Sequence, residues 1–479
     1  MKLYKSFATL CLAWSCLADL AHAQAVDQGT VQTTLYNFCA GGGCTNGSFN
    51  YPWGGANLVQ ATNGGLFGTT YAGGAYGFGT VFKITPSGTF TTLYNFCATS
   101  GCPDGSYPYF GFARATDGVL YGITNQGGAY GEGTVFKITP GGALTTLYSF
   151  CVLSGCPDGA IPQGALVQAS DGKFYGTTSG GGAYGAGTVF KMTPSGTLTT
   201  LYSFTGNADG ASPQAALVQA TDGNFYGTTY NNGVNNNGTI FKITPGGRLT
   251  TLYSFNGTDG GTSQAGLMQA SNGDLYGTGK FGGASAIGSI FSITLGGTLT
   301  TLYEFSGPDG AWPNSALIQA TDGNLYGTTE IGGTGDAGTI FTITPSGTLT
   351  TLYQFPNTLF IGGNNVYAGV VQATNGTLYG VTNNDGTAGD GTVFNLCAGL
   401  CPFVETLQKS GAVGAAVSIL GTDLTDATSV TFNGTTAIFT VVSDSEIKTT
   451  VPTGATTGTI EVTTPSRLLP SNVVFTVVP

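Results

Sequence analysis

Three short sequence elements recur seven times along this chain, and their repetition limits the folds open to it more than any other feature. The first element is Leu-Tyr-x-Phe, the second is an apolar residue followed by an aromatic residue and glycine, and the third is Gly-(Thr/Ser)-(Val/Ile)-Phe. Each returns at a spacing of 50 to 58 residues. The tyrosines of the first element are Tyr36, Tyr94, Tyr148, Tyr202, Tyr253, Tyr303 and Tyr353. Such a spacing indicates a repeat protein in which each copy is one structural unit that packs against its neighbours.

Each repeat contains four short β-rich runs. In one copy these runs are residues 215–220, 224–229, 239–244 and 248–255, and none has the length or the 3.6-residue period of an amphipathic helix. Tight-turn sequences, Thr-Asp-Gly at 221–223 and Pro-Gly-Gly at 245–247, join the first two runs and the last two. Four antiparallel strands in a repeat of this length are typical of a propeller blade.

The two ends of the repeat array predict how it closes. Residues 31–38 form a lone copy of the fourth strand, whereas residues 369–396 form three strands that lack a fourth. If the first segment joins the last unit, neither end leaves a strand edge unpaired. We therefore predict an all-β chain with a seven-bladed β-propeller over residues 31–396, closed three-plus-one. The alternative is an open solenoid, which leaves half a unit unpaired at each end.

The repeats resemble a known family. One copy reads Asp-Gly-Asn-Phe-Tyr-Gly-Thr-Thr at 222–229, followed by Gly-Thr-Ile-Phe-Lys-Ile-Thr-Pro at 238–245. This pattern resembles the GloVer-type tandem-repeat family of secreted bacterial proteins, over residues 31–396. The resemblance implies no activity, because the family offers no functional residue to carry over.

The composition changes after residue 401, where glycine becomes less frequent and β-branched residues alternate. Residues 397–401 are predicted to be a linker with a cysteine pair, and residues 402–479 contain at least five short β-rich runs, which predict a small immunoglobulin-like β-sandwich. Val-Ser-Ile-Leu-Gly at 417–421, Val-Thr-Phe-Asn-Gly at 430–434 and Ile-Glu-Val at 460–462 resemble an IPT/TIG domain. The resemblance implies a spacer or contact module, the alternative being a stalk with no site of its own.

Residues 1–23 are typical of a secretory signal peptide. Lys2 and Lys5 precede a largely apolar run, and Ala21-His22-Ala23 forms a cleavage site. The run is too short for a permanent anchor, and no later run reaches the ~18 apolar residues that a spanning helix needs. We expect no membrane span and a secreted protein, outside the cell or at its surface, with the periplasm as the alternative.

Loss of this segment restricts the available chemistry. His22 is the only histidine, so the mature chain has no imidazole for a Ser-His-Asp or Cys-His mechanism or for a histidine-bound metal. The mature chain carries 13 − 2 = 11 Lys and Arg against 24 − 1 = 23 Asp and Glu, a net charge of about −12. Because no basic cluster could neutralise phosphates, we expect no nucleic-acid partner.

Eight cysteines remain, in four closely spaced pairs: Cys39 and Cys44, Cys97 and Cys102, Cys151 and Cys156, Cys397 and Cys401. Three pairs share one spacing after the Leu-Tyr-x-Phe element, and the other repeats lack both members together. Joint presence and joint absence indicate local partners, so we predict disulfides within each pair.

The loop after the Leu-Tyr-x-Phe element carries an aspartate followed by glycine in five copies. These residues are Asp104, Asp158, Asp209, Asp259 and Asp309, with Asn46 at the corresponding place in the first copy. The simpler interpretation is a turn that uses Asp-Gly to reach a left-handed φ. The alternative is a ring of carboxylates that binds a ligand or calcium. We otherwise expect no cofactor and no metal.

Aromatic residues gather in the same loops. Tyr51, Tyr107 and Trp312 stand just before the proline, with Trp53 nearby, and Tyr367 extends the arc to the seventh copy. Aromatic faces beside carboxylates suit stacking on sugar rings, so these residues and the five aspartates are the predicted ligand-binding set. The alternative is that they cover the neighbouring loop. Tyr76, Tyr130 and Tyr184, in Gly-Gly-Ala-Tyr-Gly loops, add aromatic surface in the first three copies only.

Three functions remain open. The first is a binding protein whose long-loop face contacts a glycan or a protein, with the sandwich as spacer. The second is a glycan-cleaving enzyme that uses a carboxylate pair, for which Glu132, Glu330, Arg114 and Asp104 are the candidates. The third is a structural matrix component. Because similar residues are spread over every copy, the pattern favours binding or structure, and we assign no catalytic residue.

Overall fold

A computed structural model describes residues 30–41, 43–49, 57–356, 365–384 and 386–478. Within these ranges the chain forms strands and no helix, so no described helix could cross a membrane. The predicted signal peptide, residues 1–23, lies outside the described residues.

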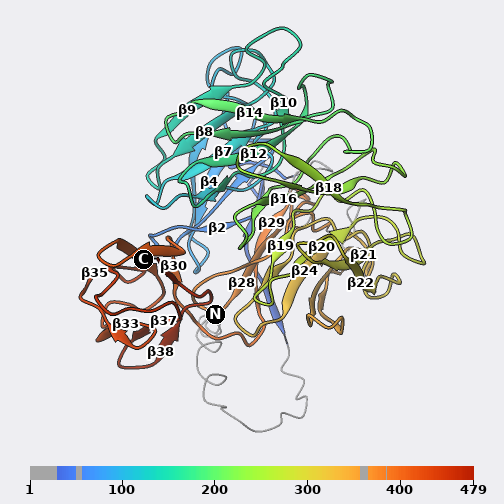
Figure 1. The fold of residues 1–479 in the computed structure, drawn as a ribbon. Helices are drawn as coiled ribbons and strands as arrows, with labels where there is room; N and C mark the ends of the chain where they lie inside the picture. Colours follow the sequence, from blue (N-terminus) through green and yellow to red (C-terminus); the bar gives the residue numbers. More distant parts are fainter. Residues whose placement is uncertain (1–29, 42, 50–56, 357–364, 385, 479) are drawn as a thin grey trace, which may run out of the picture.

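Seven antiparallel sheets make up the larger part of the molecule (Figure 1). Blade 1 contains β2 (Val59–Gln60), β3 (Leu66–Thr70), β4 (Thr80–Ile84) and β5 (Phe90–Asn95). Blade 2 contains β6 (Ala113–Arg114), β7 (Leu120–Thr124), β8 (Thr134–Ile138) and β9 (Leu144–Ser149). Blade 3 contains β10 (Ala160–Pro162), β11 (Val167–Gln168), β12 (Phe174–Gly180), β13 (Thr188–Met192) and β14 (Leu198–Ser203).

The remaining blades follow the same order. Blade 4 contains β15 (Val218–Gln219), β16 (Phe225–Thr229), β17 (Thr239–Ile243) and β18 (Leu249–Ser254); blade 5 contains β19 (Met268–Gln269), β20 (Leu275–Gly279), β21 (Ser289–Ile293) and β22 (Leu299–Glu304). Blade 6 contains β23 (Ile318–Gln319), β24 (Leu325–Thr329), β25 (Thr339–Ile343) and β26 (Leu349–Gln354). Blade 7 contains β27 (Val371–Gln372), β28 (Leu378–Thr382), β29 (Thr392–Cys397) and, from the start of the chain, β1 (Val31–Asn37).

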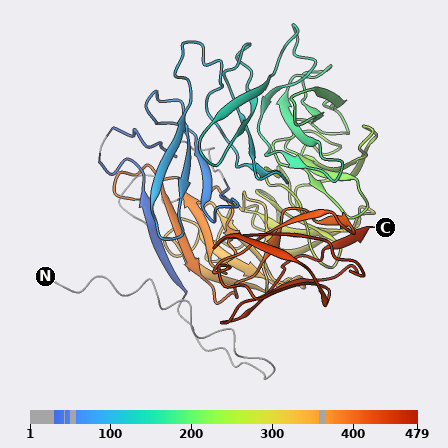
Figure 2. The ribbon, with the colours of Figure 1, turned by 90° about the vertical axis from the view of Figure 1, so that its left-hand side faces the viewer.

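The pairing of β1 with β29 closes the ring. The two strands are antiparallel, with Val31 opposite Cys397 and Asn37 opposite Thr392. In Figure 2, β1 (dark blue) runs beside the orange strands of blade 7. The prediction of a seven-bladed, three-plus-one propeller is therefore confirmed, and the open solenoid is excluded.

The repeated sequence elements are explained by the contact between the second and third strands of each blade. Gly227 in β16 lies opposite Phe241 in β17, and a Cβ on this glycine would lie 2.7 Å from the end of the phenylalanine ring. The glycine of the second element thus makes room for the phenylalanine of the third. Both strands are buried, and the apolar side chains form seven clusters, each shared by two neighbouring blades.

Hydrogen bonds at the inner edge also link neighbouring blades. The last residue of the inner strand is glutamine in six blades, and its side-chain oxygen accepts a hydrogen bond from a backbone N–H of the preceding blade, as Gln219 does from Ser170 at 2.9 Å. The glutamines that do this are Gln60, Gln168, Gln219, Gln269, Gln319 and Gln372. Blade 2 has Arg114 at this position instead.

Three predicted disulfides are present, namely Cys39–Cys44, Cys97–Cys102 and Cys151–Cys156. Cys397 is also disulfide-bonded. Its pairing with Cys401 stays a prediction.

The C-terminal strands form two sheets around a separate core. One sheet contains β30 (Glu405–Thr406), β32 (Ala416–Leu420), β36 (Glu446–Thr450) and β35 (Phe439–Ser443); the other contains β34 (Thr435–Thr436), β33 (Ser429–Phe432), β37 (Ile460–Thr463) and β38 (Leu468–Pro470). β31 (Ser410–Ala412) and β39 (Thr476–Val478) pair in parallel. Buried side chains such as Val417, Ile447 and Val462 fill the space between the sheets, as expected for an immunoglobulin-like sandwich.

This sandwich is docked on the short-hairpin end of blades 7, 1 and 2 (Figure 1). Arg114 lies 2.6 Å from Glu405, and its guanidinium also donates to the carbonyl of Gln60. Three side-chain hydrogen bonds add to the contact: Gln408 to the carbonyl of Thr116, Ser445 to the carbonyl of Thr62, and Thr374 with Thr422. The arginine that interrupts the glutamine series is therefore a docking residue for the second domain.

We predict that Arg114→Gln, which restores the residue of the other six blades, weakens this docking by about 1–2 kcal/mol, because a charge-assisted hydrogen bond is lost while Glu405 is about one-third exposed. A double-mutant cycle with Glu405→Gln, measured by urea unfolding, should give a coupling energy of that size. Additive effects of the two substitutions would show that the ion pair contributes nothing to docking.

Candidate functional site

The two ends of the propeller differ in their charge. The chain within residues 31–396 has eight Lys and Arg residues. Seven lie at or beside the short-hairpin end: Lys83, Arg114, Lys137, Lys173, Lys191, Lys242 and Arg248. Lys280, which directly follows β20, is alone on the opposite end, where the long loops lie. We call that end the long-loop face, and it is acidic.

The predicted aspartate ring is built from pairs within each copy. The tyrosine of the Leu-Tyr-x-Phe element donates its hydroxyl hydrogen bond to the loop aspartate, at 2.9 Å for Tyr94 to Asp104 and 2.5 Å for Tyr303 to Asp309. The same bond forms from Tyr148 to Asp158 (2.8 Å), from Tyr202 to Asp209 (3.0 Å) and from Tyr253 to Asp259. Each carboxylate also accepts a backbone N–H of its own loop. These contacts support the turn interpretation, in which aspartate and tyrosine hold the loop together.

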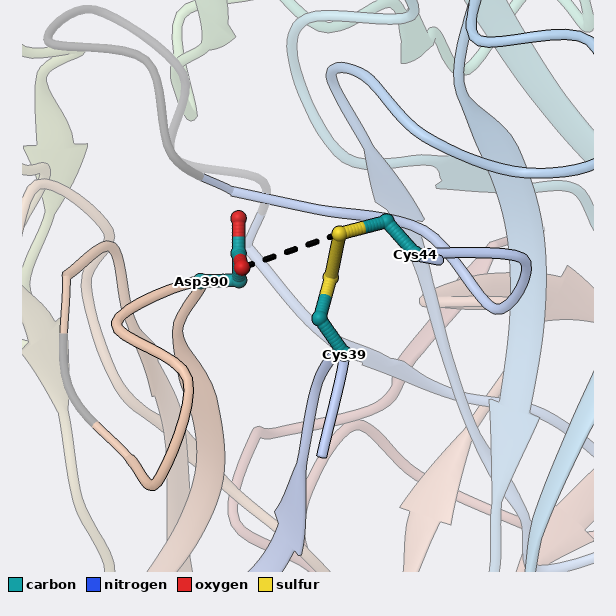
Figure 3. Close-up of side chains that lie close together, drawn as sticks. All are labelled: Cys39, Cys44 and Asp390. Atoms are coloured by element: carbon teal, nitrogen blue, oxygen red, sulfur yellow. Dashed lines mark hydrogen bonds between the residues drawn. A yellow bond between two sulfur atoms is a disulfide. The ribbon is translucent and has the colours of Figure 1, made fainter. Parts of the chain in front are cut away.

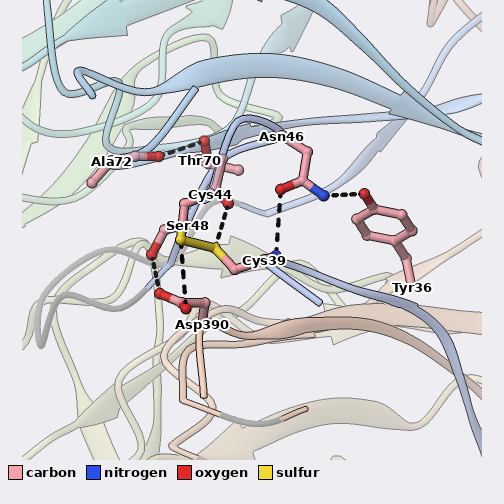
Figure 4. The surroundings of a disulfide bond; sticks show 9 residues. Tyr36, Cys39, Cys44, Asn46, Ser48, Thr70, Ala72 and Asp390 are labelled. Carbon is pink, nitrogen blue, oxygen red and sulfur yellow. Dashed lines mark hydrogen bonds between the residues drawn. A yellow bond between two sulfur atoms is a disulfide. The ribbon is translucent and has the colours of Figure 1, made fainter. Parts of the chain in front are cut away.

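The first copy uses different groups for the same purpose (Figure 4). Asn46 donates to the hydroxyl of Tyr36 and accepts the N–H of Cys39 at 3.3 Å. Asp390, from the long loop of blade 7, supplies the carboxylate and accepts a 2.7 Å hydrogen bond from Ser48.

The only trio of acidic or cysteine groups within 4.8 Å in the described residues is Cys39, Cys44 and Asp390 (Figure 3). The two sulfur atoms are joined in a disulfide, so neither is a thiolate able to bind a metal. The five aspartates stand on separate loops, and nothing in their arrangement gathers the oxygen ligands that calcium needs.

The aromatic set divides into three parts. Tyr51 and Trp53 lie outside the described residues. Tyr107 stacks on Tyr71 with ring centroids 4.9 Å apart, so its ring covers the end of blade 1. Trp312 lies edge-on to Phe281 at 5.8 Å and faces a charged group instead.

That charged group belongs to a cluster from three blades, Lys280 and Phe281 (blade 5), Trp312 and Glu330 (blade 6) and Tyr367 (blade 7), which we call the blade 5–7 cluster. The ammonium of Lys280 lies 2.6 Å from the carboxylate of Glu330, and both side chains are only 5–6% exposed. The same ammonium lies 5.5 Å from the Trp312 ring centre and 5.7 Å from that of Tyr367. Burial, and then the hydrogen bond to Glu330, raise the pKa of Tyr367 above its ordinary value, so this hydroxyl remains a donor.

Amide side chains stand in the loops that lead into the inner strands of blades 4, 5 and 6. Gln264 donates to Gln214 of the neighbouring blade at 3.0 Å. The side-chain oxygens of Gln264 and Asn314 are buried and accept no hydrogen bond from the described residues. Such acceptors are satisfied by water or by hydroxyl groups of a ligand.

Sequence reasoning selected Trp312, Glu330 and Tyr367 but missed Lys280. The available signal was the position four residues after the aromatic residue of the second element. It holds Tyr71, Asn125, Ser179, Tyr230, Lys280, Glu330 and Asn383 in the seven copies, whereas the strand before it hardly varies. The other candidate acid–base residues do not join the cluster, because Arg114 binds Glu405 at the opposite end and Glu132 belongs to blade 2.

Comparison with known families agrees with this architecture. The Gloeobacter/Verrucomicrobia repeat matches residues 24–168, 152–307 and 249–438, and the IPT/TIG domain matches residues 402–477. The chain belongs to the Gloeobacter/Verrucomicrobia repeat family. No protein with a curated description matches it.

Solved structures resemble this family member only distantly. The extracellular domain of a protein described as a hybrid two-component system from B. thetaiotaomicron matches with a TM-score of 0.49 and 11% identity, over 88% of this chain and 52% of that one, so this chain spans about half of its length. A fungal alcohol oxidase in complex with copper gives 0.48 and 12% over 88% and 96%, and the aldose sugar dehydrogenase of Streptomyces coelicolor gives 0.41 and 16% over 77% and 98%.

The tyrosine–aspartate pairs predict how the Gloeobacter/Verrucomicrobia repeats respond to alkali. Burial and the aspartate hydrogen bond raise the pKa of Tyr94, Tyr202, Tyr253 and Tyr303 from 10.0 to about 12. Because the folded pKa is raised, the stability from these groups is complete below pH 10 and is lost as the pH rises towards 12. Asp309→Asn should lower the pKa of Tyr303 by part of this shift, since burial is the larger cause. The difference in tyrosinate absorbance between variant and parent measures it, with Asp336→Asn as the control.

Removing one partner of the Lys280–Glu330 ion pair should destabilise blades 5 and 6 more than removing both. Glu330→Gln leaves the buried ammonium of Lys280 uncompensated, so we expect a loss of about 3–5 kcal/mol in urea unfolding. The double variant Lys280→Met with Glu330→Gln should recover most of that loss, because no buried charge remains. Glu132→Gln serves as the control and should change stability little, because Glu132 lies on the same face and forms no ion pair with a described residue. Equal losses for the single and double variants would argue against the pair.

Proposed function

We propose that this protein is a secreted or cell-surface binding protein that holds a glycan at the blade 5–7 cluster, with the C-terminal sandwich as a spacer. The observation that carries the proposal is that, among the described residues, a buried charged pair flanked by aromatic rings occurs once on a face where the other features repeat. Residues that depart from a repeated pattern at the loop end of a rigid scaffold are where binding specificity is usually found.

The groups of the cluster suit a neutral sugar. The indole of Trp312 is partly exposed and can stack on the apolar face of a sugar ring, while the buried Lys280–Glu330 pair holds the indole in place from beneath. The acidic long-loop face disfavours an anionic ligand, since Lys280 is its only cation and is already paired.

An extracellular location is supported by the disulfides, because such bonds form and persist in oxidising compartments. Catalysis is less well supported. Glycan hydrolysis needs two carboxyl groups about 5–9.5 Å apart, whereas Glu330 is the only acid among the five residues of the cluster.

A screen of glycans and polysaccharides, scored for both retention and cleavage, tests the proposal. We expect retention without cleavage, and we expect Trp312→Ala to weaken it at least tenfold, about 1.4 kcal/mol, while circular dichroism stays unchanged. Ile161→Ala is the matched control, because Ile161 occupies the same loop position in blade 3 with the same φ of 56° but has no charged pair beside it. Tyr107→Ala, run in parallel, measures how far the binding set extends. Retention that survives Trp312→Ala would refute a site at the cluster, and released product would favour the enzyme.

A further inference from the structure

Three tyrosines are displayed on the long-loop face of adjacent blades, away from the blade 5–7 cluster. Tyr76, Tyr130 and Tyr184 follow the second strand of blades 1, 2 and 3, and 49%, 52% and 66% of their surfaces are exposed. The corresponding residues in the other four copies are Asn235, Ser285, Gly335 and Ala388. At this loop position, aromatic side chains are therefore confined to blades 1 to 3.

The same three blades carry the three disulfide loops. The backbone N–H of Gly74, two residues before Tyr76, donates to the carbonyl of Cys44 at 2.8 Å. Gly128 and Cys102, beside Tyr130, and Gly182 and Cys156, beside Tyr184, repeat this bond at 2.8 Å. Blades 4 to 6 form the equivalent bond to Asn207, Thr258 and Gly307, in loops that have neither cysteines nor an exposed tyrosine. Each exposed tyrosine thus comes with a disulfide that holds the loop beneath it.

In blades 1 and 2, a second contact fixes the loop from the outer strand. The N–H of Ala75 donates to the side chain of Asn95 at 2.8 Å, and that of Ala129 donates to Ser149 at 3.2 Å. Exposed rings on loops that are tied at both sides lose little conformational freedom when a ligand binds, which is the main cost for a surface aromatic residue.

The charges around the tyrosines favour a neutral partner. Asp104, Asp158 and Asp209 lie next to the inner tyrosines, which are Tyr94, Tyr148 and Tyr202. The exposed tyrosines lie close enough to these inner tyrosines to contribute to their raised pKa. These carboxylates are already held by a tyrosine and backbone N–H groups, so they can accept a further hydroxyl but do not demand a cation. No lysine or arginine of the described propeller lies on this side of the face to attract an anionic polymer.

We propose that Tyr76, Tyr130 and Tyr184 form a contact strip for an extended, neutral polysaccharide that crosses blades 1 to 3. One ring per blade matches a ligand whose own units repeat, and three weak stacking contacts on one chain reinforce each other by effective concentration. The proposal rests on the glycan-binding function above and extends it from a short sugar at the blade 5–7 cluster to a polymer.

Affinity electrophoresis of the full chain tests the strip. The probes are soluble neutral polysaccharides (xyloglucan, β-1,3-glucan, mannan and dextran), their short oligosaccharides, and polygalacturonate as the anionic polymer. We expect a neutral polysaccharide to bind at least tenfold more tightly than its own oligosaccharide. The triple variant Tyr76→Ala, Tyr130→Ala, Tyr184→Ala should abolish this difference and leave oligosaccharide binding unchanged. Because all three side chains are exposed, the variant should fold normally.

Three further variants separate stacking from other causes. The triple Tyr→Phe variant should keep most of the polymer affinity, and Val234→Ala, which removes an exposed apolar side chain from the equivalent loop of blade 4, should keep all of it. Removing one disulfide with Cys151→Ser and Cys156→Ser should weaken polymer binding several-fold without unfolding the protein, because the loop that carries Tyr184 is then less constrained.

The outcomes distinguish the strip from the proposed function. If oligosaccharides bind and Trp312→Ala abolishes this, but the polymer binds no tighter, the strip is refuted and the function stands. Polymer binding that survives the triple Tyr→Ala variant, or tighter binding of polygalacturonate or of a basic protein such as polylysine, also refutes the strip. If no glycan of any length is retained, both proposals fail.

Discussion

Backbone pairing between β1 and β29 holds the two ends of the propeller together, and the other features depend on it. The strand before the first full blade becomes the outer strand of the last one, so Val31 lies opposite Cys397. The entropic cost of closing a loop grows only with the logarithm of its length, so fastening distant ends costs little more than closing a short loop. The same pairing places the Cys39–Cys44 loop against Asp390 of blade 7, which completes the loop beneath Tyr76.

Repetition and divergence have separate roles in this molecule. The glycine–phenylalanine contact, the shared apolar clusters and the tyrosine–aspartate pairs recur because each copy must meet the same neighbours in the same way. The departures are few and each has a visible consequence. Arg114 docks the second domain, Lys280 and Glu330 form a buried pair, and the cysteine loops accompany the exposed tyrosines.

Most of the fold could be predicted from the sequence, because strand period, turn residues and the unequal ends of the array are local signals. The site was less accessible. Trp312 and Glu330 stood out as irregular residues, but their partner Lys280 belongs to the preceding copy, and the pair forms only where the two blades pack side by side. The aspartates stood out because they recur in five copies. Each accepts a hydrogen bond from a tyrosine of its own copy, so the simpler turn interpretation accounts for them. Arg114 was visible as a lone cation, yet its partner is contributed by a domain about 290 residues further along the chain (405 − 114 = 291).

The docking of the sandwich has a consequence for how the molecule is oriented. Its contacts occupy the short-hairpin end, so the long-loop face points away from it. A partner that binds the sandwich would therefore also set the direction in which the long-loop face points. The ion pair between Arg114 and Glu405 opposes rotation of the sandwich relative to the propeller and so helps to hold this orientation.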